Sequence, residues 1–388
     1  MSSSTETHLW PESGAATVRE ILQQPDVWRE ASDDLEGQQK DLHAFLSPLL
    51  ERPELRIVLT GAGTSAFVGS IAAPALSRLL DRRVDAIATT DIVSNPQLYF
   101  AEDVPTLLVS FARSGNSPES SAATQLADSI LSDVSHLIVT CNESGRLFRD
   151  QAGRVKSKVV LMPLRANDEG FAMTSSFSSM LLSSLLIFGG ADDSAVVALS
   201  AAASRLLETM QGPAQELATR GFERVVYLGS GPLTGLARES ALKLLELTAG
   251  KVVSYYDSSL GFRHGPKSVL NDNTLVVVYV SSDPYTRHYD IDIITELQST
   301  IPAKNLVVIS ALPIALAPEI RVLVLEELSE LDDAFLAVAF VIFAQLLALS
   351  FSVQLGMTPD NPFPGGDVNR VVKGVQIYPL GNNAAEEN

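Results

Sequence analysis

Cysteine is nearly absent from this chain of 388 residues and occurs once, at Cys141. A single cysteine excludes an intramolecular disulfide and fits a reducing compartment. Histidine is also scarce, with five residues, and the sequence contains no HxH, HExxH or CxxC pattern. These spacings are the usual signs of a zinc site built from protein ligands, so the sequence does not support one.

Positive charge is also in short supply, with 28 Lys and Arg against 46 Asp and Glu and a net charge of −18. A surface that neutralises many phosphates is not expected, so nucleic acid is excluded as a partner. An anionic substrate must instead be held locally, by backbone amides, hydroxyls and a few cations. The N-terminus, MSSSTETHLWPES, lacks the apolar run of a signal peptide. We therefore expect a cytoplasmic protein.

One long uncharged stretch, residues 334–359, has the length of a membrane span. It contains Gln345, Ser350, Ser352 and Gln354, follows several acidic residues and has no flanking cluster of Lys or Arg. A helix buried between layers or subunits is apolar all round as well. We predict such a buried helix and no membrane contact.

The remaining sequence is typical of a globular α/β protein, with 46% apolar and 19% charged residues. Residues 19–50 have apolar residues at helical spacing and predict a helical extension. After it, short apolar runs rich in β-branched residues alternate with helix-like segments. This alternation predicts βαβ units, in which a parallel sheet is covered by helices on both faces.

The pattern occurs twice. LTGAG around Gly61 returns as YLGSG around Gly229, TLLVS at Thr106 as TLVVV at Thr274, and LIVTC at Leu137 as LVVIS at Leu306. The three offsets are 168, 168 and 169 residues, which indicates a duplicated α/β unit. We therefore predict an N-terminal helical extension (1–52), a first α/β domain (53–193), a helical linker (194–222), a second α/β domain (223–357) and a C-terminal tail (358–388).

Two turns of the first domain are candidates for ligand binding. Residues 61–66, GAGTSA, follow a predicted strand and precede a predicted helix. With Asp85 or Asp91 further along, this spacing suggests a dinucleotide fold, but the glycines also suit a plain strand-to-helix turn. A second turn, residues 110–120 (SFARSGNSPES), favours a third interpretation, a phosphate site.

In this second turn, Ser117 and Pro118 are typical of a helix start. Free amides and the helix dipole favour an anion there. Since neighbouring parallel strands end at the same edge of a sheet, we expect the two turns to meet. The hydroxyls would come from Thr64, Ser65, Ser114 and Ser117. A third turn, with Thr174 and Ser175, either completes the pocket or simply caps a helix.

The second domain has SSDP at residues 281–284 in place of this turn, so we expect it to contribute different chemistry. Glu239, Lys243 and Glu246 share one helix face by their spacing. Such a face is usually a solvated ladder of ion pairs. Their neighbours are so apolar, however, that we expect a buried helix whose carboxylates have partners or a function. His264 lies on a predicted loop, GFRHGPK, where it is either structural or catalytic.

These residues give the chain a specific resemblance. It resembles double sugar-isomerase (SIS) domain proteins, above all the galactosamine-6-phosphate deaminase/isomerase family, also called tagatose-6-phosphate ketose/aldose isomerase. It is similar, more distantly, to the isomerase half of glucosamine-6-phosphate synthase. The segments that carry the resemblance span nearly the whole chain in order: LTGAGTSAF, SFARSGNSPES, GFAMTSS, YLGSG, ARESALKLLELTAGK, YDSSLGFRHGPKS and VNRVVKG.

The resemblance implies a role for each candidate residue. The sugar phosphate would be bound by Gly63, Thr64, Ser65, Ser114 and Ser117, with Thr174 or Ser175 nearby. Glu246 would shuttle the proton, His264 open the sugar ring, Glu239 and Lys243 support them, and Lys373 close over the sugar. A homodimer or higher oligomer with a shared site is implied, as are a sugar-phosphate substrate and no cofactor.

The chain departs from the synthase in two places. It lacks the glutaminase domain, which excludes amination driven by an amide. It also has ARSGNS where the synthase has SQSGET, so Arg113 is expected to alter the contacts with the sugar.

The resemblance predicts conversion of galactosamine 6-phosphate to tagatose 6-phosphate and ammonia. Plain aldose–ketose isomerisation and deamination of glucosamine 6-phosphate are alternatives. A non-catalytic sugar-phosphate regulator would have no need of Glu246, His264 and Lys373 together.

Overall fold

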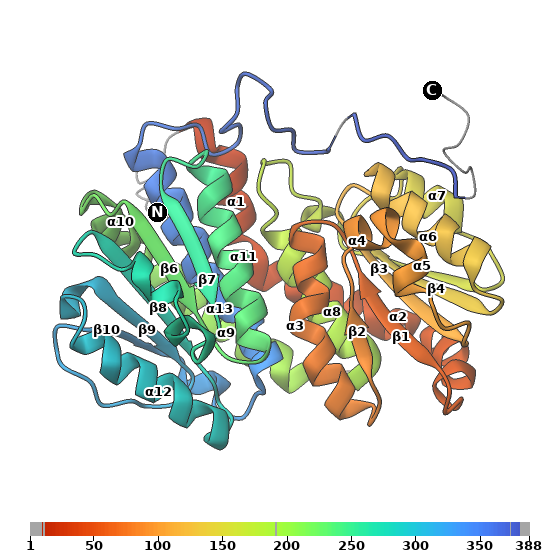
Figure 1. Cartoon of the computed structure of the whole chain (residues 1–388), viewed down its shortest axis with the longest axis horizontal. Helices are drawn as coiled ribbons and strands as arrows, with labels where there is room; N and C mark the ends of the chain where they lie inside the picture. The colour runs from red at the N-terminus through yellow and green to blue at the C-terminus, as the bar shows by residue number, and fades with distance from the viewer. Residues whose placement is uncertain (1–9, 11, 191, 373, 381–388) are drawn as a thin grey trace, which may run out of the picture.

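The chain folds into two α/β halves, each built on a five-stranded parallel sheet (Figure 1). The computed structural model describes residues 10, 12–190, 192–372 and 374–380. The first sheet has the order β2-β1-β3-β4-β5 and the second β10-β9-β8-β6-β7. The strands are β1 (Arg56–Thr60), β2 (Val84–Ala86), β3 (Thr106–Ala112), β4 (Val134–Thr140), β5 (Ser157–Leu161), β6 (Arg224–Leu228), β7 (Val253–Asp257), β8 (Thr274–Val280), β9 (Leu306–Ser310) and β10 (Arg321–Val324).

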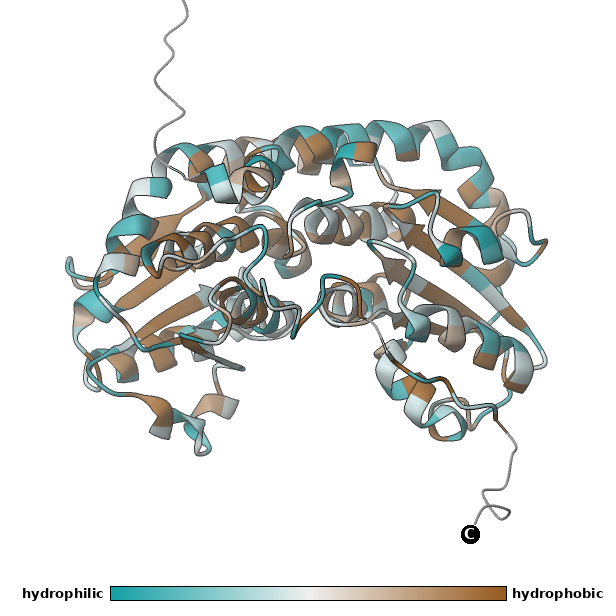
Figure 2. Ribbon diagram, turned by 90° about the horizontal axis from the view of Figure 1, so that it is seen from above, coloured by the Kyte–Doolittle hydropathy of each residue, from teal (hydrophilic) through white to brown (hydrophobic). Residues whose placement is uncertain are grey.

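The predicted fold class is confirmed, and the central strands show why the sequence specifies it. Every residue of β3, β4 and β8 is buried, which agrees with their nearly continuous apolar runs. Helices cover both faces of such strands, so the sequence has no reason to alternate apolar and polar residues. Figure 2 shows hydrophobic strands in the interior and hydrophilic segments on the outer helices.

The sequence repeat is a structural repeat. Read from its β7 edge, the second sheet has the same strand order as the first. Arg56 pairs with Thr106 in the first sheet, and Arg224 pairs with Thr274 in the second, at the same offset of 168 residues. The following turns match as well, since Gly63 has φ 56° and ψ −128° and Gly231 has φ 56° and ψ −127°. A positive φ of this kind favours glycine in both turns.

The two halves meet through helices. α11 of the second half packs against α3 of the first half and against α13. The helices of the first half are α1 (Ala15–Leu22), α2 (Gln24–Leu50), α3 (Thr64–Leu79), α4 (Thr89–Ser94), α5 (Pro96–Tyr99), α6 (Pro118–Ile130), α7 (Arg146–Gln151) and α8 (Ser175–Gly189). The later helices are α9 (Asp193–Thr209), α10 (Gln211–Thr219), α11 (Pro232–Leu247), α12 (Pro284–Gln298) and α13 (Asp333–Gln354).

α13 is the long apolar stretch of the sequence. It is the one helix among the described residues that is long and apolar enough to cross a membrane, and 94% of its most apolar window is buried inside the fold. α9, α10 and α11 pack against it, and Gln345 accepts a hydrogen bond of 2.7 Å from Gln24 of α2. α13 is thus placed as a core helix that joins the two halves.

The C-terminal tail continues from the end of α13. It runs across the top of the view in Figure 1, from the second half to the first. Asp360 binds the backbone amides of Ala16 and Thr17 at the start of α1, at 3.0 and 2.8 Å. The ring of Phe363 lies 5.1 Å from that of Phe171. The tail is therefore attached to the start of α1 and to the loop before α8.

Candidate active site

The candidate site lies where the start of α3 meets α11, so that each half contributes residues. Lys243 of α11 is fully buried, and its ammonium Nζ lies 2.5 Å from Glu246 Oε2 and 3.4 Å from Glu239 Oε1. The same nitrogen donates a hydrogen bond of 3.0 Å to the hydroxyl of Thr64 at the start of α3. The helix face predicted from the spacing therefore exists, and it points toward the first half.

The two carboxylates of this cluster differ in their surroundings. Glu239 is fully buried, and this burial raises its pKa to about 8, with Glu246 adding to the effect and Lys243 opposing it. Glu246 keeps 24% of its side chain exposed beside the buried ammonium. Both carboxylates raise the pKa of Lys243, against the effect of its burial. Glu246 is therefore the more accessible carboxylate of the cluster, and its contact with Lys243 holds it in place.

The turn between β3 and α6 has the geometry of an anion site. Gly115 has a φ of 63°, and Ser117 is the N-cap of α6, accepting a bond from the amide of Ser120. The hydroxyls of Ser117 and Ser120 lie 2.6 Å apart, and Ser114 Oγ accepts a bond from the amide of Asn116. Ser114 and Ser117 are only partly buried, so their hydroxyls remain accessible to a ligand.

Arg113 is held by backbone carbonyls close enough to the cluster for Glu246 to act on its charge, and its contact with the sugar remains a prediction. Its side chain is buried and donates to the backbone carbonyls of Phe171 and Arg370, at 3.1 and 2.9 Å. Arg370 in turn donates to the carbonyl of Asp168. These bonds connect the end of β3, the loop before α8 and the tail.

The third turn, at the start of α8, is held by an internal carboxylate. Asp168 accepts bonds from the amides of Thr174, Ser175 and Ser176, at 2.8, 3.1 and 2.9 Å. The hydroxyl of Thr174 also donates to Asp168, and that of Ser175 donates to the carbonyl of Glu20. All three residues of the turn are fully buried. The hydroxyls of Thr174 and Ser175 are thus engaged by Asp168 and by α1, and their contact with a ligand remains a prediction.

Sequence reasoning missed Asp168 and Glu20. Glu20 of α1 is almost fully buried and accepts bonds from the amides of Glu169 and Gly170. Burial and the neighbouring Asp168 raise its pKa to about 7. A sequence signal existed for Asp168, which stands shortly before a helix start rich in Ser and Thr. No such signal exists for Glu20, whose partners lie about 150 residues away in the chain.

His264 has no described bond to the cluster of Glu239, Lys243 and Glu246. It is exposed between two short 3₁₀ helices, Gly261–Arg263 and Pro266–Val269. Arg263 and Lys267 on either side both pair with Glu296 of α12. Among the described residues, no hydrogen bond or ion pair joins His264 to Glu246, so the structure does not bring these two predicted residues into direct contact.

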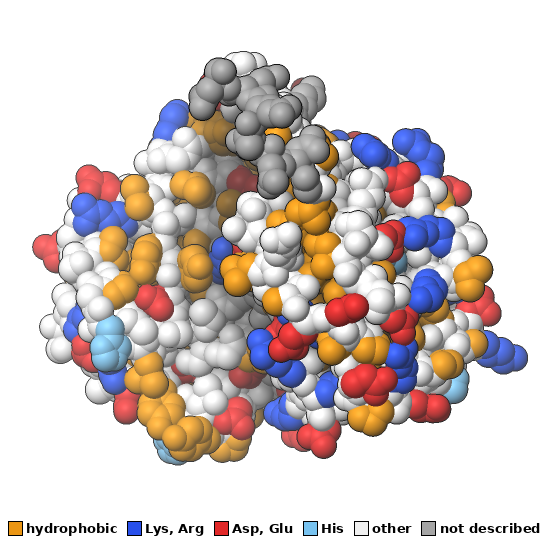
Figure 3. Space-filling model, turned by 45° about the vertical axis from the view of Figure 1, so that its right-hand side comes forward, with side chains coloured by type: hydrophobic (Ala, Val, Ile, Leu, Met, Phe, Trp, Pro, Cys, Tyr) orange, Lys and Arg blue, Asp and Glu red, His pale blue; other side chains and the backbone are white. Residues whose placement is uncertain are grey.

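The remaining features concern the surface and possible ligands. Figure 3 shows a hollow between two lobes of the surface, with charged side chains inside it.

Across the described part of the chain, no three His, Cys, Asp or Glu side chains are grouped to hold a metal ion. Lys373, predicted to close over the sugar, falls outside the described residues.

Comparisons with known proteins give the site a context. No protein-family profile matches the chain. The chain is 43% identical over 371 residues to D-galactosamine-6-phosphate deaminase AgaS of Shewanella sp. strain ANA-3, which covers 94% of this chain and 92% of that protein. It is 53% identical over 372 residues to the AgaS protein of Streptomyces coelicolor, which covers 95% and 97%.

A solved structure agrees with these relatives. The crystal structure of tagatose-6-phosphate ketose/aldose isomerase from Escherichia coli superposes with a TM-score of 0.88 at 40% identity and covers 95% of this chain and 98% of that one. Identity at this level over almost the full length of the chains shows that the protein belongs to the AgaS family of sugar-phosphate deaminases/isomerases.

Proposed function

We propose that this protein is an enzyme that converts D-galactosamine 6-phosphate and water to D-tagatose 6-phosphate and ammonia. The full-length identity to AgaS relatives supports this activity. The observation that carries the chemistry is Glu246, a partly exposed carboxylate held 2.5 Å from the buried ammonium of Lys243. An aldose-to-ketose conversion needs such a base beside the sugar.

The reaction follows from the groups present. The sugar ring opens when its ring oxygen gains a proton and the anomeric hydroxyl loses one. Glu246 then takes the proton from C2 and returns it to C1, which turns the amino sugar into a ketimine. Water adds to C2, ammonia leaves with the former amino nitrogen, and the ketose 6-phosphate remains. No redox step occurs.

In this proposal the first half binds the phosphate. The acidic chain repels an anion over long distances, so the site must depend on neutral donors and helix N-termini. The β3–α6 turn offers the partly exposed hydroxyls of Ser114 and Ser117 at the start of a helix of 13 residues. The turn of Gly63, Thr64 and Ser65 would complete the phosphate contact.

We also propose that two chains share each site, in a cytoplasmic homodimer or higher oligomer. Ring opening needs a side chain that can both donate and accept a proton, and the imidazole of His264 can do both. Its exposure, and the absence of any described bond between it and Glu246, support a supply from the neighbouring subunit. Lys373 would reach the sugar from the tail.

Plain aldose–ketose isomerisation is the second candidate. It is favoured by the likeness to the Escherichia coli structure described as a tagatose-6-phosphate ketose/aldose isomerase. The same proton transfer by Glu246 would serve it, without loss of an amino group.

One assay separates the candidates. The purified protein is incubated with galactosamine 6-phosphate, glucosamine 6-phosphate and galactose 6-phosphate, and both ammonia and ketose are measured. We expect ammonia and ketose from the first sugar and a kcat about 10²–10⁴-fold lower for Glu246→Gln. The exposed Glu319→Gln serves as the matched control. Ketose from galactose 6-phosphate, without ammonia from either amino sugar, would establish the isomerase instead.

A further inference from the structure

The structural repeat gives the phosphate-binding turns of the first half two counterparts in the second half. The β6–α11 turn, Gly229-Ser230-Gly231, corresponds to Gly61-Ala62-Gly63, as the matching backbone angles show. The β8–α12 turn, residues 281–283, corresponds to the turn that ends at Ser117, because both follow the third strand of their sheet and end in a helix N-cap.

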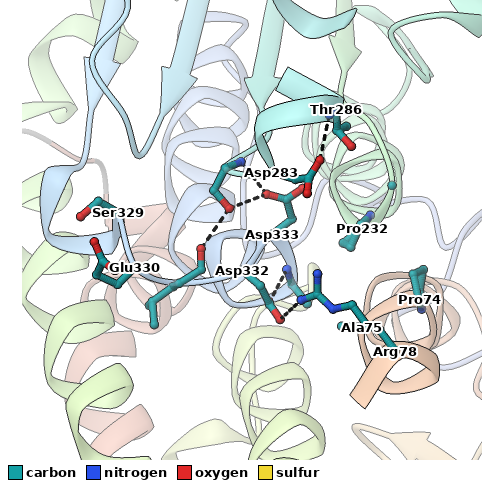
Figure 4. Close-up of a pocket in the computed structure, with 14 residues that line it drawn as sticks. Pro74, Ala75, Arg78, Pro232, Asp283, Thr286, Ser329, Glu330, Asp332 and Asp333 are labelled. Carbon is teal, nitrogen blue, oxygen red and sulfur yellow. Dashed lines mark hydrogen bonds and ion pairs between the residues drawn. The ribbon is translucent and has the colours of Figure 1, made fainter. Parts of the chain in front are cut away.

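The second half fills its β8–α12 turn with a carboxylate of the chain itself. Asp333, the first residue of α13, accepts bonds from the hydroxyl of Ser281 at 2.5 Å and from the amide and hydroxyl of Ser282 at 2.8 and 3.1 Å. The side chain of Asp333 points at this turn in Figure 4. Two hydroxyls and a backbone amide at the start of a helix are the donors that bind a phosphate oxygen elsewhere.

A second carboxylate satisfies the neighbouring turn. Asp290 of α12 is fully buried and accepts bonds from Ser230 Oγ, Ser259 Oγ and the amide of Ser281, at 2.6, 2.5 and 2.9 Å. Ser230 lies in the glycine turn of the second half. Both turns that correspond to the proposed phosphate site are therefore hydrogen-bonded to carboxyl groups of the chain itself.

The pocket beside Asp333 is lined mainly by acids, so in the native chain a free phosphate is not expected to compete with this carboxylate. The pocket has a volume of about 490 Å³, and its described lining holds one cation, Arg78, against four acids. Arg78 is already paired with Asp332 at 3.2 Å. The N-cap of α12 is Asp283, a carboxylate, where α6 has the neutral Ser117. The four acids are Asp283, Glu330, Asp332 and Asp333.

We propose that the Asp333 carboxylate occupies, in the second half, the place that a phosphate group takes in the first half, so that removing this carboxylate uncovers a latent anion-binding turn. The comparison with the first half rests on the proposed function. The occupancy of the turn by Asp333 does not depend on that proposal, because it is given by the hydrogen bonds of Ser281 and Ser282. In the native chain the hydrogen bonds of this carboxylate connect the start of the buried helix α13 to the turn after β8 of the second sheet.

The test is rescue of stability by an added anion. The Tm of wild type, Asp333→Ala and Asp333→Leu is measured in sodium phosphate and in sodium chloride of equal ionic strength. We expect both variants to melt below wild type in chloride. Phosphate should raise the Tm of Asp333→Ala by about 2 °C or more beyond its effect on wild type. Asp333→Leu should gain no more than wild type, since its side chain fills the space.

Two further variants keep the test decisive. Asp333→Ser keeps a small helix-starting side chain and should show the same rescue if the alanine variant does not fold. Adding Ser282→Ala to the rescued variant should reduce the rescue, because one donor is gone. An equal phosphate shift in all chains would overturn the proposal. The readout does not use the sugar reaction, so failure of the proposed function, seen as no ammonia from wild type, is distinguished from failure of this inference.

Discussion

Lys243 is the residue on which the candidate site depends, because its buried ammonium lies between two carboxylates and also bonds to Thr64 of the other half. A buried charge without partners would cost several kcal/mol, so each of the three contacts is needed. The side chain of Glu239 is fully buried, and that of Glu246 is partly exposed to solvent. This difference supports the proposal in which Glu239 has a supporting role and Glu246 meets the substrate.

The raised pKa of Glu239 predicts a pH dependence of stability. Its pKa is about 8 in the folded chain and lies near 4.5 without the fold, so the folded state holds a proton that the unfolded state has released between these values. The free energy of unfolding should therefore fall as the pH rises from about 5 to about 8. Glu20, with a pKa of about 7, acts in the same direction. In wild type this fall should be on the order of a few kcal/mol. Glu239→Gln should make the fall smaller, because the titrating carboxyl is gone.

Urea unfolding at pH 5, 6, 7 and 8 measures this effect. Glu319→Gln, an exposed substitution of the same kind, should follow the wild-type curve. If the Glu239→Gln curve also runs parallel to wild type, Glu239 keeps an ordinary pKa in the folded chain.

For single residues, the sequence predicts contacts within one helix or strand but misses contacts between residues that only the fold brings together. The face of Glu239, Lys243 and Glu246 follows from helical spacing. The bonds of Arg113 to carbonyls of Phe171 and Arg370 do not, because they join positions 58 and 257 residues apart. The expected sugar contact of Arg113 came from its place in the motif alone.

The two glycine turns allow a matched comparison of elements. A Cβ on Gly61 would lie 2.6 Å from the backbone of Ser65, and one on Gly229 would lie 2.6 Å from the backbone of Leu233. Alanine at either position should therefore shift the start of the following helix and cost about 1–3 kcal/mol of stability. Only Gly61→Ala displaces the proposed phosphate turn, so it should raise the KM for galactosamine 6-phosphate much more than Gly229→Ala does. Equal KM effects would contradict the division of labour between the halves.

The tail is the second element with a testable attachment. Arg113 donates a hydrogen bond to the backbone carbonyl of Arg370. This carbonyl is part of the peptide bond that trypsin cleaves, the one that follows Arg370. Arg113→Met should therefore speed this cut by about tenfold, since a hydrogen bond from a charged donor is lost. The KM should rise as well if the tail covers the substrate. Arg146→Met, which removes an exposed arginine paired with Asp150, is the control and should leave the cut unchanged. An unchanged rate in Arg113→Met would show that other contacts hold the tail.

The elements themselves are predictable from the sequence where one physical signal dominates. Apolar runs predicted the strands, and the repeat predicted two sheets of one kind. The long apolar helix was correctly expected to be buried, since its polar Gln345 finds a buried partner in Gln24. The filled turn of the second half could not be predicted, because Asp333 lies 51 residues beyond Ser282 and its side chain returns to that turn only in the folded sheet.

The whole molecule combines two similar halves for which we propose different tasks. α11 packs against α3, which brings the cluster of Lys243 and the proposed base Glu246 to the turn that contains Thr64, one of the proposed phosphate turns. The predicted domain boundaries agree with an active site between the halves but remain a prediction. His264 is exposed and has no described bond with Glu246, so its supply by a neighbouring subunit remains a proposal.

Co-expression of two inactive chains tests whether sites are shared. In a heterodimer of Glu246→Gln and His264→Asn chains, a shared site leaves one intact pair of Glu246 and His264 out of two. Random pairing then gives about a quarter of wild-type activity. If each chain uses its own histidine, every site carries a substitution and the mixture stays inactive. A chain with both substitutions, co-expressed with wild type, gives the converse control. It should retain about a quarter of the activity when sites are shared and about a half when they are not.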